Sequence, residues 1–178
     1  MKLDTVKVEQ TDLGDHYDPE DKVVRLSKPH FEGRSLAAVV VAAHEVGHAM
    51  QDATAYPPLR ARTSMAKRAA GIERFGSFVM LAAPILMLLS RSPVVLVLDL
   101  AAGAIILLMG VVMHMVTLPV EFDASFRRAL PVLKAGNYVR AEDMPAARTI
   151  LRAAAFTYVA AAAMSILSIA RWLRVLRF

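Results

Sequence analysis

The stretch Leu36-Ala37-Ala38-Val39-Val40-Val41-Ala42-Ala43-His44-Glu45-Val46-Gly47-His48 decides how this sequence folds. Ser35 precedes it and is a typical helix N-cap, so we expect a helix from there to about Asp52. The apolar run before His44 is too short to cross a bilayer, which favours a buried core helix. Residues four apart share one face of a helix, so His44 and His48 would direct two imidazoles at one place.

This histidine pair predicts a metal site, because Glu45 lies beside it, where a carboxylate can deprotonate a water that the metal polarises. The plainer interpretation is a pair of hydrogen-bonded core histidines and an ordinary helix glutamate. Gly47 costs the helix about 1 kcal/mol relative to alanine. It either admits a neighbouring backbone or substrate, or is merely tolerated in the packing.

The composition is that of a membrane protein. Of 178 residues, 56% are hydrophobic, and the mean hydropathy is +0.44. There is no cysteine, so a zinc site would need nitrogen and oxygen ligands. The net charge of +5 is interpreted as a determinant of topology and of contact with anionic lipid, not with nucleic acid.

The first 34 residues are polar, and they lack the apolar core of a signal peptide, so we expect insertion through internal spans. Val6–Glu9 alternates apolar and charged residues and Lys22–Ser27 is β-rich, which predicts two strands. Tyr17–Asp21 between them has turn chemistry, so a small hairpin or sheet edge is expected. Tyr56-Pro57-Pro58 should then break the chain.

Three later segments are candidate membrane spans: Phe75–Ser90, Val94–Leu118 and the alanine-rich Ala153–Ala170. Five Lys/Arg residues precede the first span within residues 60–74, six follow the second within residues 127–152, and the turn between them has only Arg91. The positive-inside rule therefore predicts that both flanking segments are cytoplasmic. The expected organisation is an N-terminal β element and histidine helix (1–71), a transmembrane hairpin (72–118), a cytoplasmic segment (119–152) and a third membrane segment with a basic tail (153–178).

A catalytic zinc ion normally has three protein ligands and a water. The hairpin returns the chain to the side of the histidine helix just before Glu121, which we predict as the third ligand; His114, at the end of a span, is its nearest competitor. Asp123 is a candidate to hold a histidine N–H from behind. His16, between the two strand candidates, is either an oxyanion-stabilising residue or a surface histidine.

Several stretches resemble the YugP family of membrane zinc metallopeptidases: Asp15-His16-Tyr17-Asp18-Pro19, Ala42-Ala43-His44-Glu45-Val46-Gly47-His48-Ala49, Tyr56-Pro57-Pro58-Leu59-Arg60, Thr117-Leu118-Pro119-Val120-Glu121-Phe122-Asp123-Ala124-Ser125 and Ala153-Ala154-Ala155-Phe156-Thr157-Tyr158-Val159. More distantly, the layout is similar to gluzincins of the HtpX and CAAX-prenyl-protease type, in which a transmembrane hairpin separates the histidine pair from a glutamate ligand. Those proteins commonly have an aspartate four residues after the glutamate, where this sequence has Ser125. YugP-like proteins usually begin with an additional membrane helix, whereas this sequence opens close to its first strand.

The sequence thus predicts a mainly α membrane protein with a small N-terminal β element and a zincin-like catalytic helix. We expect a zinc endopeptidase of the cell (inner or plasma) membrane, with its active site facing the cytoplasm and with membrane or misfolded proteins as candidate substrates. A β edge within residues 1–34 would bind the polypeptide as an added strand. One alternative is a membrane scaffold or adaptor with a structural or vestigial zinc site, closed by a fourth ligand such as His16 or His114. Another is a zinc hydrolase that acts on something other than a peptide.

Overall fold

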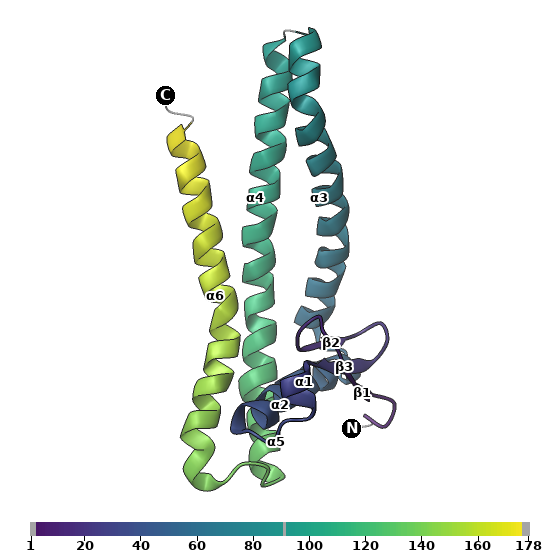
Figure 1. Cartoon of the computed structure of the whole chain (residues 1–178), viewed down its shortest axis with the longest axis vertical. Coiled ribbons are helices and arrows are strands. Elements are labelled where there is room, and N and C mark those ends of the chain that lie inside the picture. Colours follow the sequence, from purple (N-terminus) through teal and green to yellow (C-terminus); the bar gives the residue numbers. More distant parts are fainter. Residues whose placement is uncertain (1–2, 91, 176–178) are drawn as a thin grey trace. The chain divides into compact units, whose positions relative to one another are not determined.

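The computed structural model describes residues 3–90 and 92–175, which belong to two compact units. One unit combines Met1–Arg60 with Thr117–Thr157, and the other combines Ala61–Val116 with Tyr158–Phe178. Three short strands are followed by helices, as Figure 1 shows. The predicted fold class, mainly helical with a small N-terminal β element, is therefore confirmed.

The sheet of the first unit has three strands, β1 (Lys7–Gln10), β2 (His16–Asp18) and β3 (Val23–Leu26), in the order β1-β3-β2. β1 pairs with β3 in parallel, and β2 pairs with β3 antiparallel. The two strands predicted from the sequence are therefore present, but they do not form a hairpin with each other. The hairpin joins β2 to β3, and β2 occupies part of the segment that was predicted to be a turn.

The turn itself is shorter than predicted and lies after Asp18. The Asp18 side chain accepts a hydrogen bond from the Glu20 N–H (2.8 Å), a local bond typical of Asx turns, and Lys22 has a positive φ of 56°. Strand β2 pairs with β3, and its Tyr17 reaches the later helix Leu36–Ala53, where the tyrosine hydroxyl donates to the Asp52 carboxylate (2.8 Å). This long-range contact overrides the local turn preference that the sequence displays.

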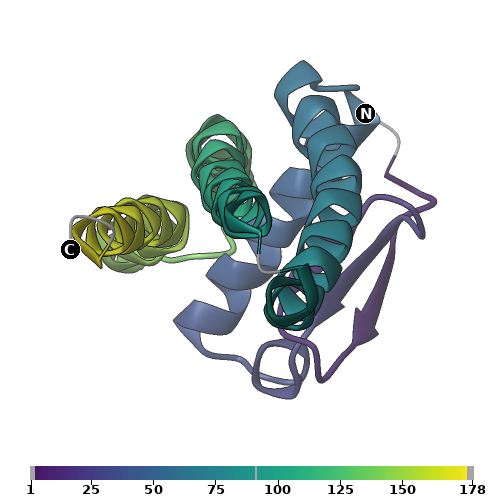
Figure 2. The same cartoon turned by 90° about the horizontal axis from the view of Figure 1, so that it is seen from above.

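Helix α2 (Leu36–Ala53) follows the single turn α1 (Lys28–Phe31) and carries the histidine pair. It begins as predicted, because the Ser35 side chain accepts a hydrogen bond from the Ala38 N–H. The sheet packs on one side of α2 through Val24, Leu26 and Ala49 (Figure 2). A short sheet of this kind is not stable alone, so its packing on α2 is what holds it.

Two long helices follow: α3 (Pro57–Ser90), which starts at the predicted proline break, and α4 (Pro93–Phe122). They run side by side in Figures 1 and 2. The chain then stays helical, through a π-helix η1 (Asp123–Ala129) and α5 (Leu130–Ala135). The sequence did not predict this continuation past Pro119. A turn follows, in which Gly136 caps α5 and Asn137 has a φ of 50°.

After a 3₁₀ turn η2 (Ala141–Asp143), helix α6 (Met144–Val175) completes the described chain. The start of α6 joins α2, η1 and α5 in the main core of the first unit, whose buried members are Val40, Ala43, Ala129, Leu133, Val139, Ala147 and Leu151. Among the described residues, three stretches are long and apolar enough to cross a membrane: Pro57–Leu86, Pro93–Ala135 and Ala141–Leu167. Each includes most of one predicted span.

Candidate metal centre

The structure brings His44, His48 and Glu121 together in the first unit. Their potential ligand atoms all lie within 4.8 Å of one another. The Glu121 Oε2 atom is 3.2 Å from Nε2 of His44 and 3.5 Å from Nε2 of His48. All three side chains are buried, with relative exposures of 7%, 6% and 3%. Residues from two distant parts of the sequence thus converge on one small, buried space.

Two elements create this convergence. Helix α2 presents His44 and His48 on one face, with the ring centroids 4.8 Å apart and the rings nearly perpendicular. Glu121 lies in the last turn of α4, immediately before the π-helix η1. A single π-helical turn is rare in proteins and is frequent at functional sites.

Gly47 permits the close packing of α2 against η1. A Cβ atom at this position would lie 2.7 Å from the Ala124 carbonyl oxygen, which is closer than real Cβ contacts. The close approach of a neighbouring backbone, one of the two explanations offered for this glycine, is therefore confirmed.

The nitrogen of each histidine that points away from the cluster has its own partner. His44 Nδ1 lies 3.1 Å from the hydroxyl of Ser125, which is fully buried. His48 Nδ1 lies 2.9 Å from Oε1 of Gln51, which is also fully buried. Such contacts fix the ring orientation and leave the Nε2 atoms facing Glu121.

Asp123 reaches His48 through Gln51 and not directly. The Gln51 Nε2 atom donates to the Asp123 carboxylate (2.9 Å) and to the Val120 carbonyl (2.8 Å). Arg128 donates to the same Asp123 oxygen (2.6 Å) and to the Thr54 hydroxyl (3.1 Å). The predicted direct contact between Asp123 and a histidine N–H is therefore wrong, since the Gln51 side chain occupies the space between them.

Glu45 lies beside the cluster and is itself buried, with 7% relative exposure. Burial raises the pKa of its carboxyl, and the negative charges of Glu121 and Asp15 add to this, while His48 and His44 oppose it. Burial lowers the pKa of His48, but contact with Glu121 outweighs burial and the net shift is upward. The upward shift of His48 means that positive charge is favourable next to Glu121, whereas the shift of Glu45 reflects mainly its burial.

The donor set suits a zinc ion. Ligand atoms of a tetrahedral zinc lie about 3.3 Å apart, close to the two nitrogen–oxygen separations in the cluster. Two imidazoles and a carboxylate are the usual ligand types of catalytic zinc, and three protein ligands leave a fourth position open. The residues present therefore fit this metal.

The cluster found in the described part of the chain includes neither His16 nor His114. His16 lies on β2, where its Nδ1 atom is 2.8 Å from the Gly14 carbonyl oxygen. His114 lies on α4 in the second unit, with its ring centroid 6.3 Å from that of Tyr158.

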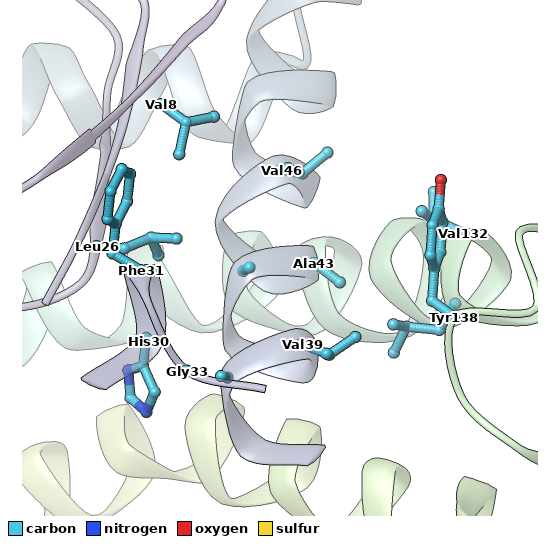
Figure 3. A pocket seen from close by; sticks show the side chains of 13 residues that line it. Val8, Leu26, His30, Phe31, Gly33, Val39, Ala43, Val46, Val132 and Tyr138 are labelled. Atoms are coloured by element: carbon cyan, nitrogen blue, oxygen red, sulfur yellow. The ribbon is translucent and has the colours of Figure 1, made fainter. Parts of the chain in front are cut away.

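An apolar groove of about 440 Å³ adjoins α2. Figure 3 shows Leu26 and Phe31 on one side of α2, and Val132 and Tyr138 on the other. Val8 of β1 also lines the groove, whereas none of the three clustered residues does. This groove is therefore separate from the metal cluster.

Sequence reasoning missed Gln51, Ser125 and Arg128. A usable signal existed for two of them. Gln51 follows His48 by three residues and so shares its helix face, and Ser125 occupies the position at which the gluzincins of similar layout commonly have an aspartate. Arg128 carried no such signal, because its role depends on the π-helical geometry of η1.

Comparison with known proteins gives a consistent result. A family model described as "Putative neutral zinc metallopeptidase" matches residues 1–177. The "Putative membrane protease YugP" of Bacillus subtilis (strain 168) is 39% identical to this chain over 167 residues, which cover 92% of this chain and 68% of that protein. No solved structure matches the chain. The family match extends over nearly the whole chain, including all three clustered residues.

Proposed function

This chain belongs to that neutral zinc metallopeptidase family, and on this premise we propose that it is a membrane-bound zinc endopeptidase whose metal is held by His44, His48 and Glu121. The observation that carries the proposal is the burial of these three donors within 4.8 Å of one another. A site with three protein ligands is typical of catalytic zinc, whereas structural zinc is usually enclosed by four. The scaffold alternative is therefore less well supported.

In the proposed reaction, Glu45 is the general base and then the general acid. A bound zinc ion would supply a Lewis acid for the scissile carbonyl and would make water more acidic. Glu45 takes the proton from the attacking water and delivers it to the leaving amine. The raised pKa of Glu45 suits both roles, because a carboxyl that titrates closer to neutral pH can both accept and return a proton.

We further propose that the polypeptide substrate adds along the outer edge of β2. One side of β2 pairs with β3, and within the described residues the other side pairs with no strand. Asp15 directly precedes β2, and its charge raises the pKa of Glu45, so this edge is within electrostatic reach of the general base. A strand bound through its backbone would extend past His16, our candidate for stabilising the oxyanion.

The proposed location is the cell (inner or plasma) membrane, with the active site at the cytoplasmic face. Its support is the three membrane-compatible stretches and the basic residues at both ends of the apolar region between residues 75 and 118, the first group of which lies in the N-terminal half of α3. The bilayer is then a permanent partner of the protein.

The central test compares the wild type with Glu45→Gln. Both should bind about one zinc ion per chain, and only the wild type should cleave an unfolded protein substrate. Equal cleavage by the two proteins would refute the proposed mechanism.

A second pair of variants tests the third ligand. Glu121→Ala should lose zinc, and His114→Ala should retain it, as measured by metal content after dialysis. The opposite pattern would assign the third ligand to His114. Retention of zinc by both variants would exclude each of the two residues.

A further inference from the structure

Gln51 lies between the metal cluster and an ion pair, and its contacts define its orientation. The amide nitrogen faces two groups, the Val120 carbonyl and the Asp123 carboxylate. Both groups only accept hydrogen bonds, since Asp123 is paired with Arg128. The NH₂ end of the Gln51 side chain must therefore face them, and its two hydrogens are fully used there.

The opposite end of the same amide then determines the protonation of His48. Oε1 of Gln51 faces His48 Nδ1 at 2.9 Å, and a carbonyl oxygen can only accept. Nδ1 of His48 must therefore carry a hydrogen. In the neutral ring this leaves Nε2 with a free lone pair, and Nε2 is the atom that lies 3.5 Å from Glu121.

His44 has no equivalent constraint from its partner. The Ser125 hydroxyl both donates and accepts, so its contact with Nδ1 is compatible with either neutral form of the ring. The two histidines therefore differ: the hydrogen-bond line Arg128–Asp123–Gln51 specifies the form of His48 only.

We propose that Gln51 is a positioning residue that holds His48 in its metal-binding form, with its own amide oriented by Asp123 and Arg128. The inference rests on the proposed zinc site. It adds that the neutral amide of Gln51 supports the ligand here and is itself hydrogen-bonded to Asp123, which forms a part-buried ion pair with Arg128. A carboxylate in direct contact with a ligating histidine is a common arrangement in other metal sites.

The test measures zinc affinity in purified protein by competition with a chelator. Gln51→Met keeps the length of the side chain but removes both ends of the amide, and should weaken zinc binding by about 10- to 100-fold. Asp123→Ala should weaken it less, because the Val120 carbonyl still holds the amide. When both substitutions are combined, Asp123→Ala should cause no further loss of zinc affinity, because Gln51→Met has already removed the hydrogen bonds that connect Asp123 to His48.

Asp52→Ala is the matched control. Asp52 is next to Gln51 on α2 and is also hydrogen-bonded, but its partners Tyr17 and Lys22 belong to the sheet region. Its loss should leave zinc affinity unchanged. The absorption bands of the cobalt-substituted protein provide a second readout: they should shift in Gln51→Met, in which the ligands are retained but His48 is less well oriented, and should not shift in Asp52→Ala.

Wild-type affinity in Gln51→Met, additive effects in the double variant, or an unchanged cobalt spectrum would each overturn the inference. A wild type that binds no zinc would instead refute the proposed function itself. Thermal unfolding of the metal-free variants distinguishes a specific loss of zinc affinity from a general loss of fold. A general loss of fold would lower the melting temperature, and zinc affinity would then fall for reasons unrelated to His48.

Discussion

Gly47 lets the backbone of η1 come close to α2 at the level of the histidine pair. Alanine at this position would gain about 1 kcal/mol in helix propensity. Its Cβ atom, however, would lie 2.7 Å from a backbone oxygen that cannot rotate away. Overpacking of this kind costs about 1–3 kcal/mol. We therefore expect Gly47→Ala to lower the stability of the first unit and to weaken zinc binding, as measured by thermal unfolding and chelator competition.

Gly110→Ala is the control for this prediction. Gly110 lies inside α4, and a Cβ atom there would meet nothing within 4 Å. The substitution should be neutral or stabilising and should leave zinc affinity unchanged. If Gly47→Ala behaves in the same way, the close approach of η1 is not what positions the site.

At the residue scale, the sequence was sufficient for the side chains that have a local signature. His44 and His48 follow from helix periodicity, and Glu121 follows from the return of the chain after the hairpin. Gln51 was not predicted, because its importance depends on Val120 and Asp123, which are about 70 positions away. A glutamine on a buried helix face has no evident meaning until its partners are known.

At the scale of elements, Asp15 connects three parts of the first unit. Its carboxylate accepts hydrogen bonds from the Ser27 N–H and hydroxyl after β3, and is 2.7 Å from the His30 ring on α1. Asp15 itself directly precedes β2. Burial acts to raise the pKa of Asp15, but the hydrogen bonds of Ser27 and His30 outweigh it and hold this pKa below its ordinary value of 3.8.

Because the pKa of Asp15 is lower in the folded state than in the unfolded state, its ionised form stabilises the fold. The contribution of Asp15 is fully present above its ordinary pKa of 3.8 and is lost as the pH falls through the lower folded value. Asp15→Asn should therefore reduce hydrogen-exchange protection of residues 23–31 at neutral pH. The difference from the wild type should shrink as the pH falls below about 4, after correction for intrinsic exchange rates.

Asp12→Asn, in the exposed part of the same loop, serves as the control and should match the wild type at every pH. A difference between Asp15→Asn and the wild type that stayed constant down to pH 2 would contradict the predicted linkage.

The elements that the sequence predicted are those whose signals are local. The Ser35 cap and the proline break before α3 both lie where expected. The parallel pairing of β1 with β3 was not predicted, because β2 lies in a segment with turn chemistry and its contact partners, β3 and Asp52 of α2, are not adjacent to it in sequence. The π-helix η1 was not predicted either, and its close packing on α2 at Gly47 involves residues more than 70 positions apart.

At the scale of the whole molecule, the second unit has an unusually apolar surface. Leu81 and Leu88 on α3 are each 78% exposed, and Val97 and Leu98 on α4 are 62% and 60% exposed. Continuous apolar surface of this kind is not maintained in water and marks contact with lipid or with another protein. Hydropathy alone predicted these stretches, because a membrane span is specified by composition over about 20 residues and not by distant contacts.

The proposed orientation follows from charge, and the absence of cysteine from the sequence makes it simple to test. Ser92→Cys places a single thiol in the turn between α3 and α4, and Ala141→Cys places one in η2, after the second predicted span. If α3 and α4 cross the bilayer with basic flanks in the cytoplasm, a membrane-impermeant maleimide should label Ser92→Cys in intact cells. It should label Ala141→Cys only after permeabilisation, with the cysteine-free wild type as the blank. The reverse pattern would place the metal cluster outside the cell, and equal labelling of both sites in intact cells would mean that the hairpin does not cross the membrane.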